Sequence, residues 1–348
     1  MLIRIMLHRA SHAGTILLRN HQKCSTVWRE TRHCSALVYR EHSHNIDTVR
    51  MEQLLLPPVG DRSVRVHMLA APVNPADMNM IQGSYPILCP LPAVGGNEGV
   101  GEVIEVGSDV TSLRPGDWVV PIDAGFGTWR TGAVCEEDEI ISVPKDVSLL
   151  GAATIFVNPC TAYRMLHDFQ TLTPGCTVIQ NASNSAVGQA VIQIAAALGL
   201  KTINIIRDRP NCAELIDELQ SLGADYVVTE EEEVPKPKLG LNCVGGLKNE
   251  KIFFIFSYEG TMVTYGGMAK RPLQIPAVSL CSSCTVFYFL VCTKNHKEQL
   301  KAMLNAVCDL MRGGQLSAPH CIQTPFHQYT HALQATVQSH CRKHVLIM

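Results

Sequence analysis

The chain has little charge of either sign and no long apolar run. It contains 29 Lys and Arg against 31 Asp and Glu, which gives a formal net charge of −2. Nucleic-acid-binding domains show a clear positive excess, so we expect no nucleic-acid partner. No apolar run approaches the roughly 18 residues that a membrane-spanning helix needs, so we expect no membrane span. With 348 residues, 46% of them hydrophobic, the chain can instead bury the cores of two ordinary domains.

Grouped cysteines are also missing, although the chain has 14 cysteines. Cys281 and Cys284 make the only close pair, and no second pair completes a four-ligand zinc site. Cys160, Cys176 and Cys243 stand alone in apolar or strand contexts, as buried reduced cysteines usually do. We therefore predict no metal site and a reducing compartment.

The first 34 residues differ in composition from the rest of the chain. Arginines are spread among Leu, Ile, Ser and Thr, and Glu30 is the only acid. This composition is typical of a mitochondrial transit peptide, and the stretch 1–18 has the amphipathic spread of one. A disordered basic tail is the alternative. We expect a leader over 1–34 and a location in the mitochondrial matrix, which is also a reducing compartment.

Short apolar strands broken by turns fill the stretch 63–143. The strings SVRVHMLAAPV, GVGEVIEVG, DWVVP and EIISV show no helical period. Pro115 and Gly116 predict a type II turn before Asp117, because glycine readily takes the positive φ that this turn needs. Many short strands in succession predict a small antiparallel barrel.

After Gly151 strands and helices alternate, and the stretch 176–209 is the clearest case. A β-branched run at 177–179 precedes a loop of small and polar residues, and a second strand is expected at 202–206. Between them, apolar residues at helical spacing predict one buried stripe: Val187, Val191, Ile194, Ala195 and Leu198. Gly199 is expected to end this helix. Such a unit gives two parallel strands with a right-handed crossover.

The same alternation continues further along the chain. We expect helices over 212–222 and 297–314, and parallel strands over 225–229, 239–246 and 261–267. The last two strands end in glycines, as strands do at the ligand edge of a doubly wound sheet. The residues after 317 show no pattern that assigns them to an element.

The loop between strand and helix at 180–188 is the candidate dinucleotide-binding turn. Of the G-x-G-x-x-G pattern only Gly188 is present, and Asn181, Ala182 and Asn184 stand where glycines are expected. An ordinary βα turn is therefore the alternative. A turn of this kind directs backbone N–H groups and a helix N-terminus at one point, which suits a pyrophosphate.

Two arginines at the end of the second strand indicate which dinucleotide binds. Arg207 and Arg209 flank Asp208, about 20 residues after the fingerprint, where an NAD site has an acid for the ribose 2′-OH. Guanidinium groups at this position suit a 2′-phosphate, so we predict NADPH as the cofactor. A solvated basic turn is the alternative for either arginine singly.

Two stretches carry a family resemblance. The stretch 71–107 contains NPAD, QGSY and GGNEG, and the stretch 158–199 contains NASNSAVGQ. Together they resemble the medium-chain dehydrogenase/reductase superfamily. Within its zinc-free, quinone oxidoreductase-like branch they are most similar to the mitochondrial trans-2-enoyl-CoA (enoyl-[acyl-carrier-protein]) reductases. Zinc-dependent members carry His where this chain has Asn97, and asparagine is a poor zinc ligand.

The resemblance implies an α/β fold of two domains. A GroES-like β-barrel catalytic domain is expected over 35–152, and a Rossmann domain, whose doubly wound parallel sheet binds NADPH, over 153–317. Residues 318–348 are expected to return to the catalytic domain. The resemblance also implies a homodimer that reduces the trans-2 double bond of an enoyl-CoA or enoyl-acyl-carrier-protein, the last reductive step of mitochondrial fatty-acid synthesis.

Tyr85, in the QGSY string, corresponds to the proton donor of the family. Reduction places hydride on Cβ of the enoyl thioester and leaves enolate charge on its oxygen, after which Cα must gain a proton. A phenol, with an ordinary pKa of about 10, is protonated at matrix pH and can donate it. From the residues alone, a loop tyrosine beside Gly83 and Pro86 is more often a packing residue.

The resemblance also implies a set of cofactor contacts. They are Asn158, Asn184, Ser185, Ala186, Val187, Arg207, Asp208, Arg209, Tyr265, Gly266, Gly267, Met268, Phe287, Tyr288, Phe289 and Lys343. Five of these positions have an ordinary structural alternative. Asn158 suits a helix N-cap, Lys343 is of a kind usually only solvated, and an aromatic run at 287–289 is more often core.

Two segments, 230–259 and 281–292, depart from the family pattern. The first has an apolar run without helical period at 252–256, and the second is more uniformly apolar than the family's strand region, which commonly supplies dimer contacts. Two rival functions stay open. An NADPH:quinone reductase does not need Tyr85, and a catalytically silent interaction protein on the same scaffold agrees with the apolar replacements.

Overall fold

The structure is a computed structural model that describes residues 32–208, 210, 212–229, 236–245, 260–269, 271, 284–287, 297–338 and 342–348. Several positions named above lie outside these ranges: Arg209, Tyr288, Phe289, the segment 246–259 and residues 1–31.

The described strands and helices follow one another along the chain. The strands are β1 (His33–Tyr39), β2 (Arg50–Leu55), β3 (Ser63–Pro72), β4 (Ala93–Val94), β5 (Val100–Val106), β6 (Trp118–Pro121), β7 (Gly132–Glu136), β8 (Ile140–Val143), β9 (Thr177–Gln180), β10 (Lys201–Ile205), β11 (Tyr226–Val228), β12 (Leu239–Asn242), β13 (Thr261–Thr264), β14 (Cys284–Phe287), β15 (Cys321–Pro325) and β16 (Lys343–Ile347). The helices are α2 (Pro75–Ile81), α3 (Leu149–Thr154), α4 (Asn158–His167), α5 (Ala186–Ala197), α6 (Cys212–Ser221), α9 (Lys297–Arg312) and α10 (Tyr329–Val337), with 3₁₀ turns η1 (Ile46–Thr48), η2 (Glu137–Glu139) and η5 (Phe326–Gln328).

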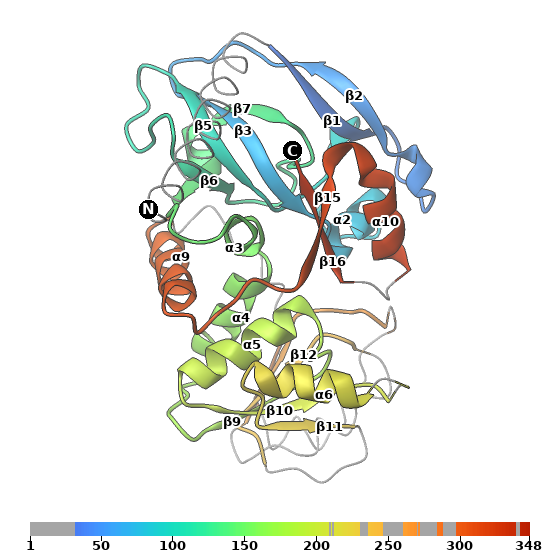
Figure 1. Cartoon of the computed structure of the whole chain (residues 1–348), viewed down its shortest axis with the longest axis vertical. Helices are drawn as coiled ribbons and strands as arrows, with labels where there is room; N and C mark the ends of the chain where they lie inside the picture. The colour runs from blue at the N-terminus through green and yellow to red at the C-terminus, as the bar shows by residue number, and fades with distance from the viewer. Residues whose placement is uncertain are drawn as a thin grey trace, which may run out of the picture.

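The β-rich part of the molecule is built on a seven-stranded sheet (Figure 1). Its strands run in the order β15-β16-β3-β5-β6-β8, and β7 pairs with β3 off this path. The sequence predicts β3, β5, β6 and β8, and their antiparallel pairing is confirmed. Gly116 has φ +97°, as the expected type II turn requires. The sequence does not predict β7.

Helix α2 is a second element that the strand pattern misses. It has only seven residues, too few to show a helical period. Its start is nevertheless marked locally: Pro75 occupies the first turn, and the Asp77 carboxylate accepts a hydrogen bond from the N–H of Asn74 at 2.7 Å. Met78, Met80 and Ile81 are buried, so tertiary packing stabilises the helix.

The other part of the molecule is a doubly wound domain. Its parallel strands run in the order β11-β10-β9-β12-β13-β14, so the strand order reverses between β9 and β12. Helices α5 and α6 lie together on one face of this sheet (Figure 1). The strands predicted at 177–179, 202–206, 225–229, 239–246 and 261–267 are all present, with small shifts at their ends.

The prediction of a single buried stripe on α5 is too narrow. Val191, Ile194 and Ala195 pack in the large core shared with α4, but Ile192 packs with α6 in a second cluster. Leu198, expected to be buried, is 36% exposed because it caps the end of the helix. Gly199 has φ +68°, as a helix-ending glycine should.

The last described residues return to the β-rich part, where α10 and β16 lie beside α2 (Figure 1). Strand β16 pairs antiparallel with β3, with Val345 opposite Pro72, and parallel with β15. At the other end, β1 begins at His33 and pairs with β2 and β4. His33 and Cys34, which the sequence assigns to the leader, therefore belong to this strand.

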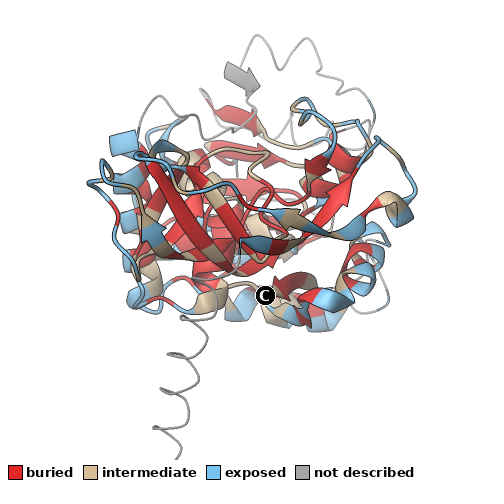
Figure 2. Ribbon diagram, turned by 90° about the horizontal axis from the view of Figure 1, so that it is seen from above, coloured by how far each residue is buried: buried red, intermediate tan, exposed pale blue. Residues whose placement is uncertain are grey.

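Buried strands lie at the centre of the molecule and exposed residues lie mostly on outer helices and loops (Figure 2). The largest core joins residues of both sheets, including Val100 and Val345 from one and Val178 and Val263 from the other. Across the described ranges no helix combines the length and apolar character that crossing a membrane requires.

The turn after β9 contains a backbone conformation that a glycine would take more easily. Ala182 has φ +53°, in the left-handed region, and it is the only non-glycine residue with positive φ in the described chain. This conformation costs an L-residue about 1–2 kcal/mol. Gly188, the third residue of α5, has no room for a side chain. A Cβ there would lie 2.6 Å from the Ser183 carbonyl oxygen.

We predict that Ala182→Gly raises the free energy of unfolding by about 0.5–1 kcal/mol. Relief of the left-handed strain exceeds the extra chain entropy that a glycine adds to the unfolded state. Ala196→Gly, at an exposed position of α5, is the matched control and should lower the free energy of unfolding by about 1 kcal/mol. Urea unfolding of the three proteins measures both changes. A loss of stability at both positions contradicts the strain at Ala182.

Candidate active site

Tyr85 lies in the loop that leaves α2. The N–H of Gly83 donates to the Met80 carbonyl at 3.0 Å, and the N–H of Ser84 donates to the Asn79 carbonyl at 2.9 Å. Gly83 has φ +72°, and a Cβ there would lie 3.0 Å from the Cβ of His42. The loop therefore leaves the helix along a fixed path, which sets the position of Tyr85.

The phenol of Tyr85 is half-buried and kept in its neutral form. Burial first, and the nearby Asp77 carboxylate second, raise the pKa of Tyr85 above its ordinary value. Both effects disfavour a phenolate, so the hydroxyl carries its proton throughout the neutral pH range. This is the state that a proton donor needs before reaction.

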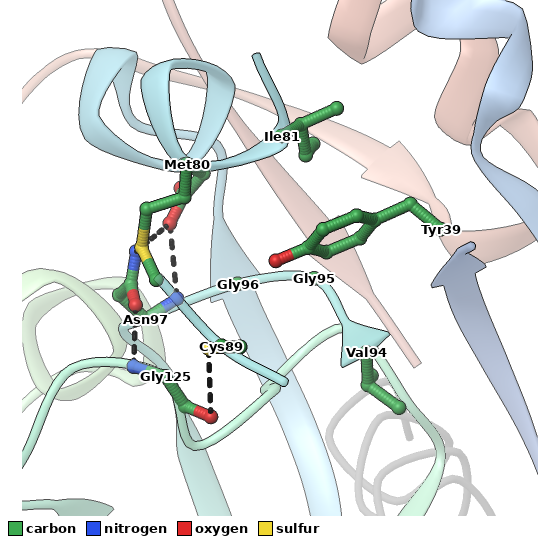
Figure 3. Close-up of a pocket in the computed structure, with 10 residues that line it drawn as sticks. Tyr39, Met80, Ile81, Cys89, Val94, Gly95, Gly96, Asn97 and Gly125 are labelled. Carbon is green, nitrogen blue, oxygen red and sulfur yellow. Dashed lines mark hydrogen bonds between the residues drawn. The ribbon is translucent and has the colours of Figure 1, made fainter. Parts of the chain in front are cut away.

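Asp77 ties α2 to the loop that contains GGNEG. Its Oδ1 accepts hydrogen bonds from the N–H of Asn97 at 3.0 Å and from Asn97 Nδ2 at 2.6 Å. The side-chain oxygen of Asn97 accepts in turn from the N–H of Gly125 at 2.6 Å. Figure 3 shows these bonds at the edge of a small cavity that Tyr39 and Cys89 also line.

The side chain of Asn97 is held by hydrogen bonds within the protein. Its amide nitrogen donates to Asp77 and its oxygen accepts from Gly125. In the described part of the chain, His, Cys, Asp and Glu form no group of three or more that could hold a metal ion.

Burial raises the pKa of Asp77 to about 7, although hydrogen bonds from Asn74 and Asn97 act to lower it. The side chain is 2% exposed. An acid in such a place costs free energy when it is ionised, and the donors around it offset part of that cost.

Glu98 is a second buried carboxylate, 1% exposed, beside the first. Its Oε1 accepts from the N–H of Val157 at 2.6 Å and its Oε2 accepts from Asn74 Nδ2 at 2.9 Å. The Asn74 side-chain oxygen accepts from the ammonium of Lys343. Burial raises the pKa of Glu98, while Lys343 and these donors oppose the shift.

Lys343 is therefore not the solvated terminal lysine of the alternative interpretation. Its side chain is half-buried, and its ammonium lies near Glu98 and Asp77. Burial lowers the pKa of Lys343, and the attraction of Glu98 opposes this.

Asn158 carries a buried donor without a partner. It is the first residue of α4, whose N-cap is Val157, so the interpretation of Asn158 as the N-cap is wrong. The residue is 6% exposed, and its Nδ2 has no hydrogen-bond partner among the described residues. An unsatisfied buried amide is costly, and a bound ligand would satisfy it.

The turn 184–187 forms the N-terminus of α5. Ser185 is the N-cap, and its hydroxyl accepts from the N–H of Gly188 at 3.1 Å. Ala186 and Val187 are the first helical residues, and Asn184 is exposed. The helix has 12 residues, enough to present a positive N-terminus to an anion.

Tyr265, Gly266, Gly267 and Met268 follow β13 at the same edge of the sheet as this turn. The Tyr265 hydroxyl is buried beside Ser185 and Cys243, and burial raises the pKa of Tyr265 well above its ordinary value. Gly267 faces open space, and Met268 is 54% exposed. The structure therefore brings 184–187 and 265–268 together.

The remaining predicted contacts are only partly described. Arg207 and Asp208 are exposed directly after β10, and Phe287 is the last residue of β14. Arg209, Tyr288 and Phe289 lie outside the described residues. The carboxyl ends of β9, β10, β12 and β13 share one edge of the parallel sheet, so Arg207 lies at the edge that carries the 184–187 turn.

Asn74, Asp77 and Glu98 are buried polar residues of the site that local sequence patterns did not identify. A usable signal was present: these polar residues stand inside short runs of apolar and small residues, VNPADM and GGNEGV. Polar side chains in such runs are buried when the chain folds, and buried polar groups need partners.

Comparisons with known proteins agree with this geometry. Residues 60–155 match the alcohol dehydrogenase GroES-like domain. The human mitochondrial enoyl-[acyl-carrier-protein] reductase is 53% identical over 319 residues, covering 87% of this chain and 85% of that protein. A solved complex of the reductase Etr1p with NADP and crotonyl-CoA is 32% identical, with a TM-score of 0.84 over 91% of this chain and all of that one.

An Etr1p/Etr2p heterodimer of mitochondrial 2-enoyl thioester reductase from Candida tropicalis is also similar. It is 31% identical, with a TM-score of 0.82 over 91% of this chain and 100% of the matched chain.

We predict that the stability of the protein falls as pH rises from about 4 to about 7, and that Asp77→Asn removes part of this fall. Because burial raises the pKa of Asp77 to about 7 from about 3.9 in the unfolded chain, the folded state binds the extra proton in this window. Above this window Asp77 is ionised in the folded protein as well, and the free energy of unfolding is lower by up to about 4 kcal/mol than at pH 4.

Urea unfolding at intervals from pH 4 to pH 8 measures this effect as the difference in slope between the two proteins. Asp138→Asn, at an exposed position, is the control and should keep the wild-type slope. Equal slopes for wild type and Asp77→Asn contradict the raised pKa.

Proposed function

The chain belongs to the mitochondrial enoyl-[acyl-carrier-protein] reductases of the medium-chain dehydrogenase/reductase superfamily, and we propose that Tyr85 is its proton donor. The protein is an NADPH-dependent oxidoreductase that reduces enoyl thioesters. The observation that carries the proposal is the half-buried phenol of Tyr85, whose pKa burial and Asp77 raise.

In the proposed mechanism, NADPH supplies a hydride to Cβ of the enoyl thioester. The hydroxyl of Tyr85 donates its proton to Cα, which turns the enolate into the saturated thioester, and solvent returns the proton to the phenolate. Asp77 holds α2 and thereby the loop of Tyr85, and its charge keeps the phenol protonated until the substrate requires the proton.

The residues present fit a dinucleotide. The unpartnered Asn158 Nδ2 offers a buried donor, the N-terminus of α5 offers backbone N–H groups, and Gly267 leaves open space at the sheet edge. Arg207 supplies positive charge for a 2′-phosphate, and Lys343 is the cation on the other side. We propose the full set of contacts named in the sequence analysis as the NADPH site.

The division of the chain supports the same assignment. We propose a catalytic domain over 35–152, a cofactor domain over 153–317 and a C-terminal return over 318–348. The pairing of β16 with β3 supports the return, and the parallel sheet β9–β14 supports the cofactor domain.

The protein is mitochondrial, and we propose the matrix as its compartment. We also propose that it acts as a homodimer and accepts either CoA or acyl-carrier-protein as the handle of the thioester. β14 is the last strand of the cofactor sheet within the described residues, and such an edge can pair with a second copy. The heterodimer of the related Candida reductases supports this assembly.

We predict that Tyr85→Phe lowers kcat for crotonyl-CoA reduction by about 10²–10⁴, because the proton donor is lost while the ring is kept. The Kd for NADPH, measured by fluorescence, should not change. Tyr226→Phe, at an exposed position of β11, is the control and should keep wild-type turnover. Full activity of Tyr85→Phe means that another group donates the proton, as a quinone-type reaction would allow.

We predict that Arg207→Ser weakens NADPH binding by roughly 10–100-fold and leaves NADH binding unchanged. A charge-assisted hydrogen bond to phosphate contributes about 1.5–3 kcal/mol, and NADH has no 2′-phosphate. The control is Arg164→Ser, which removes the ion pair of Arg164 in α4 with Asp168 and should bind both dinucleotides as wild type does. Titration of each protein with both dinucleotides decides: a parallel loss of NADPH and NADH affinity contradicts a phosphate contact.

A further inference from the structure

Glu98 is the point where four separate chain segments meet. Glu98 itself belongs to the loop before β5, and Asn74 precedes α2. Val157 precedes α4, and Lys343 begins the last strand, β16. Glu98 and Asn74 are 1% and 2% exposed, so these two side chains are closed to solvent.

Hydrogen bonds join the polar groups of these segments at the junction. Glu98 Oε1 accepts from the N–H of Val157 at 2.6 Å, and Glu98 Oε2 accepts from Asn74 Nδ2 at 2.9 Å. The other end of the Asn74 amide, its oxygen, accepts from Lys343 Nζ. The carboxylate therefore has donors on both oxygens, and the asparagine is a relay between a carboxylate and an ammonium.

This arrangement fixes the orientation of the Asn74 amide. An amide that turned over would place its nitrogen toward Lys343 and its oxygen toward Glu98, which would pair donor with donor and acceptor with acceptor. The amide oxygen of Asn74 stays directed toward Lys343 only if residue 98 presents a hydrogen-bond acceptor to the amide nitrogen of Asn74. The carboxylate of Glu98 thus controls where the ammonium of Lys343 is held, through two hydrogen bonds that share the Asn74 amide.

The same carboxylate holds the start of α4. Val157 is the N-cap of this helix and has no side-chain cap of its own, so Glu98 supplies the acceptor for its N–H. The next residue is Asn158, whose Nδ2 is buried and unpartnered. Lys343 and Asn158, which we assign to the cofactor, are thus each joined to a partner of Glu98. Lys343 is hydrogen-bonded to Asn74, and Asn158 is the chain neighbour of Val157.

We propose that Glu98 is a positioning residue for NADPH, which sets Lys343 through Asn74 and sets Asn158 through Val157. This inference rests on the proposed function, in which Asn158 and Lys343 contact the cofactor. Glu98 touches neither substrate nor cofactor in this proposal; it determines the place of two groups that do.

The test exchanges the hydrogen-bonding character of two side chains without changing their shape. In Glu98→Gln, the new amide nitrogen faces a donor, either Val157 N–H or Asn74 Nδ2, so one of the two connections breaks. In the double variant Asn74→Asp with Glu98→Gln, the glutamine nitrogen donates to the new carboxylate. That carboxylate accepts from Lys343, the glutamine oxygen accepts from Val157, and the number of negative charges is restored.

We expect Glu98→Gln to raise the Kd and the KM for NADPH at least about tenfold, with a smaller effect on kcat. The double variant should return both constants to within about threefold of wild type. The control is Glu102→Gln. Glu102 lies on β5, is partly exposed and pairs with Lys145, so this variant should bind NADPH as wild type does. NADPH binding is measured by fluorescence without substrate, and KM and kcat with crotonyl-CoA.

Three results overturn the proposal. One is unchanged NADPH affinity in Glu98→Gln. Another is a double variant that has the thermal midpoint of wild type but still binds NADPH weakly, because the restored hydrogen bonds would then have no effect on NADPH affinity. The third is a loss in kcat alone. Should Glu98→Gln not fold, the double variant decides by itself. Failure of the proposed function has a different signature: wild-type protein would bind NADPH but would not reduce crotonyl-CoA. The comparison of NADPH affinity among the three proteins would still test the role of Glu98.

Discussion

Two carboxylates buried at the seam between the domains are the constraint on which the rest of the site depends. Ionised groups are tolerated inside a protein only when donors or a cation satisfy them. The chain meets this requirement for Asp77 and Glu98 with Asn74, Asn97 and Lys343, drawn from three distant stretches. The consequence is mutual dependence, since the loop of Tyr85, the start of α4 and strand β16 cannot be placed independently of one another.

The proposed cofactor site is divided between two parts of the molecule. Its phosphate side belongs to the parallel sheet, where the turn after β9 reaches the required path with Ala182 at positive φ instead of a glycine. Its other side is assembled from Asn158 and Lys343, which the seam holds. The first side is local in the sequence and uses backbone N–H groups, whereas the second depends on contacts between residues far apart in the chain.

This division explains how much the sequence could predict. Strands β9 to β13, helix α5 and the antiparallel strands β3, β5, β6 and β8 were predictable because their signals, hydrophobic period and turn residues, are local. Helix α2 was missed because seven residues carry no period, and the second buried face of α5 was missed because it depends on α6. The partners of Glu98 and the buried place of Lys343 were beyond local reasoning, because nothing within a few residues of position 343 indicates contact with Asn74.

The pairing of β16 with β3 has a consequence for biosynthesis. Between these two strands the chain contains the whole parallel sheet, so during translation the pairing of β3 with β16 forms only after the residues of that sheet have been made. The parallel sheet can fold in the interval, as an insert within an unfinished neighbour. An emerging chain therefore contains the turn after β9 and Arg207 long before it contains Lys343, and the buried hydrogen bonds that join Lys343, Asn74 and Glu98 form only once β16 is in place.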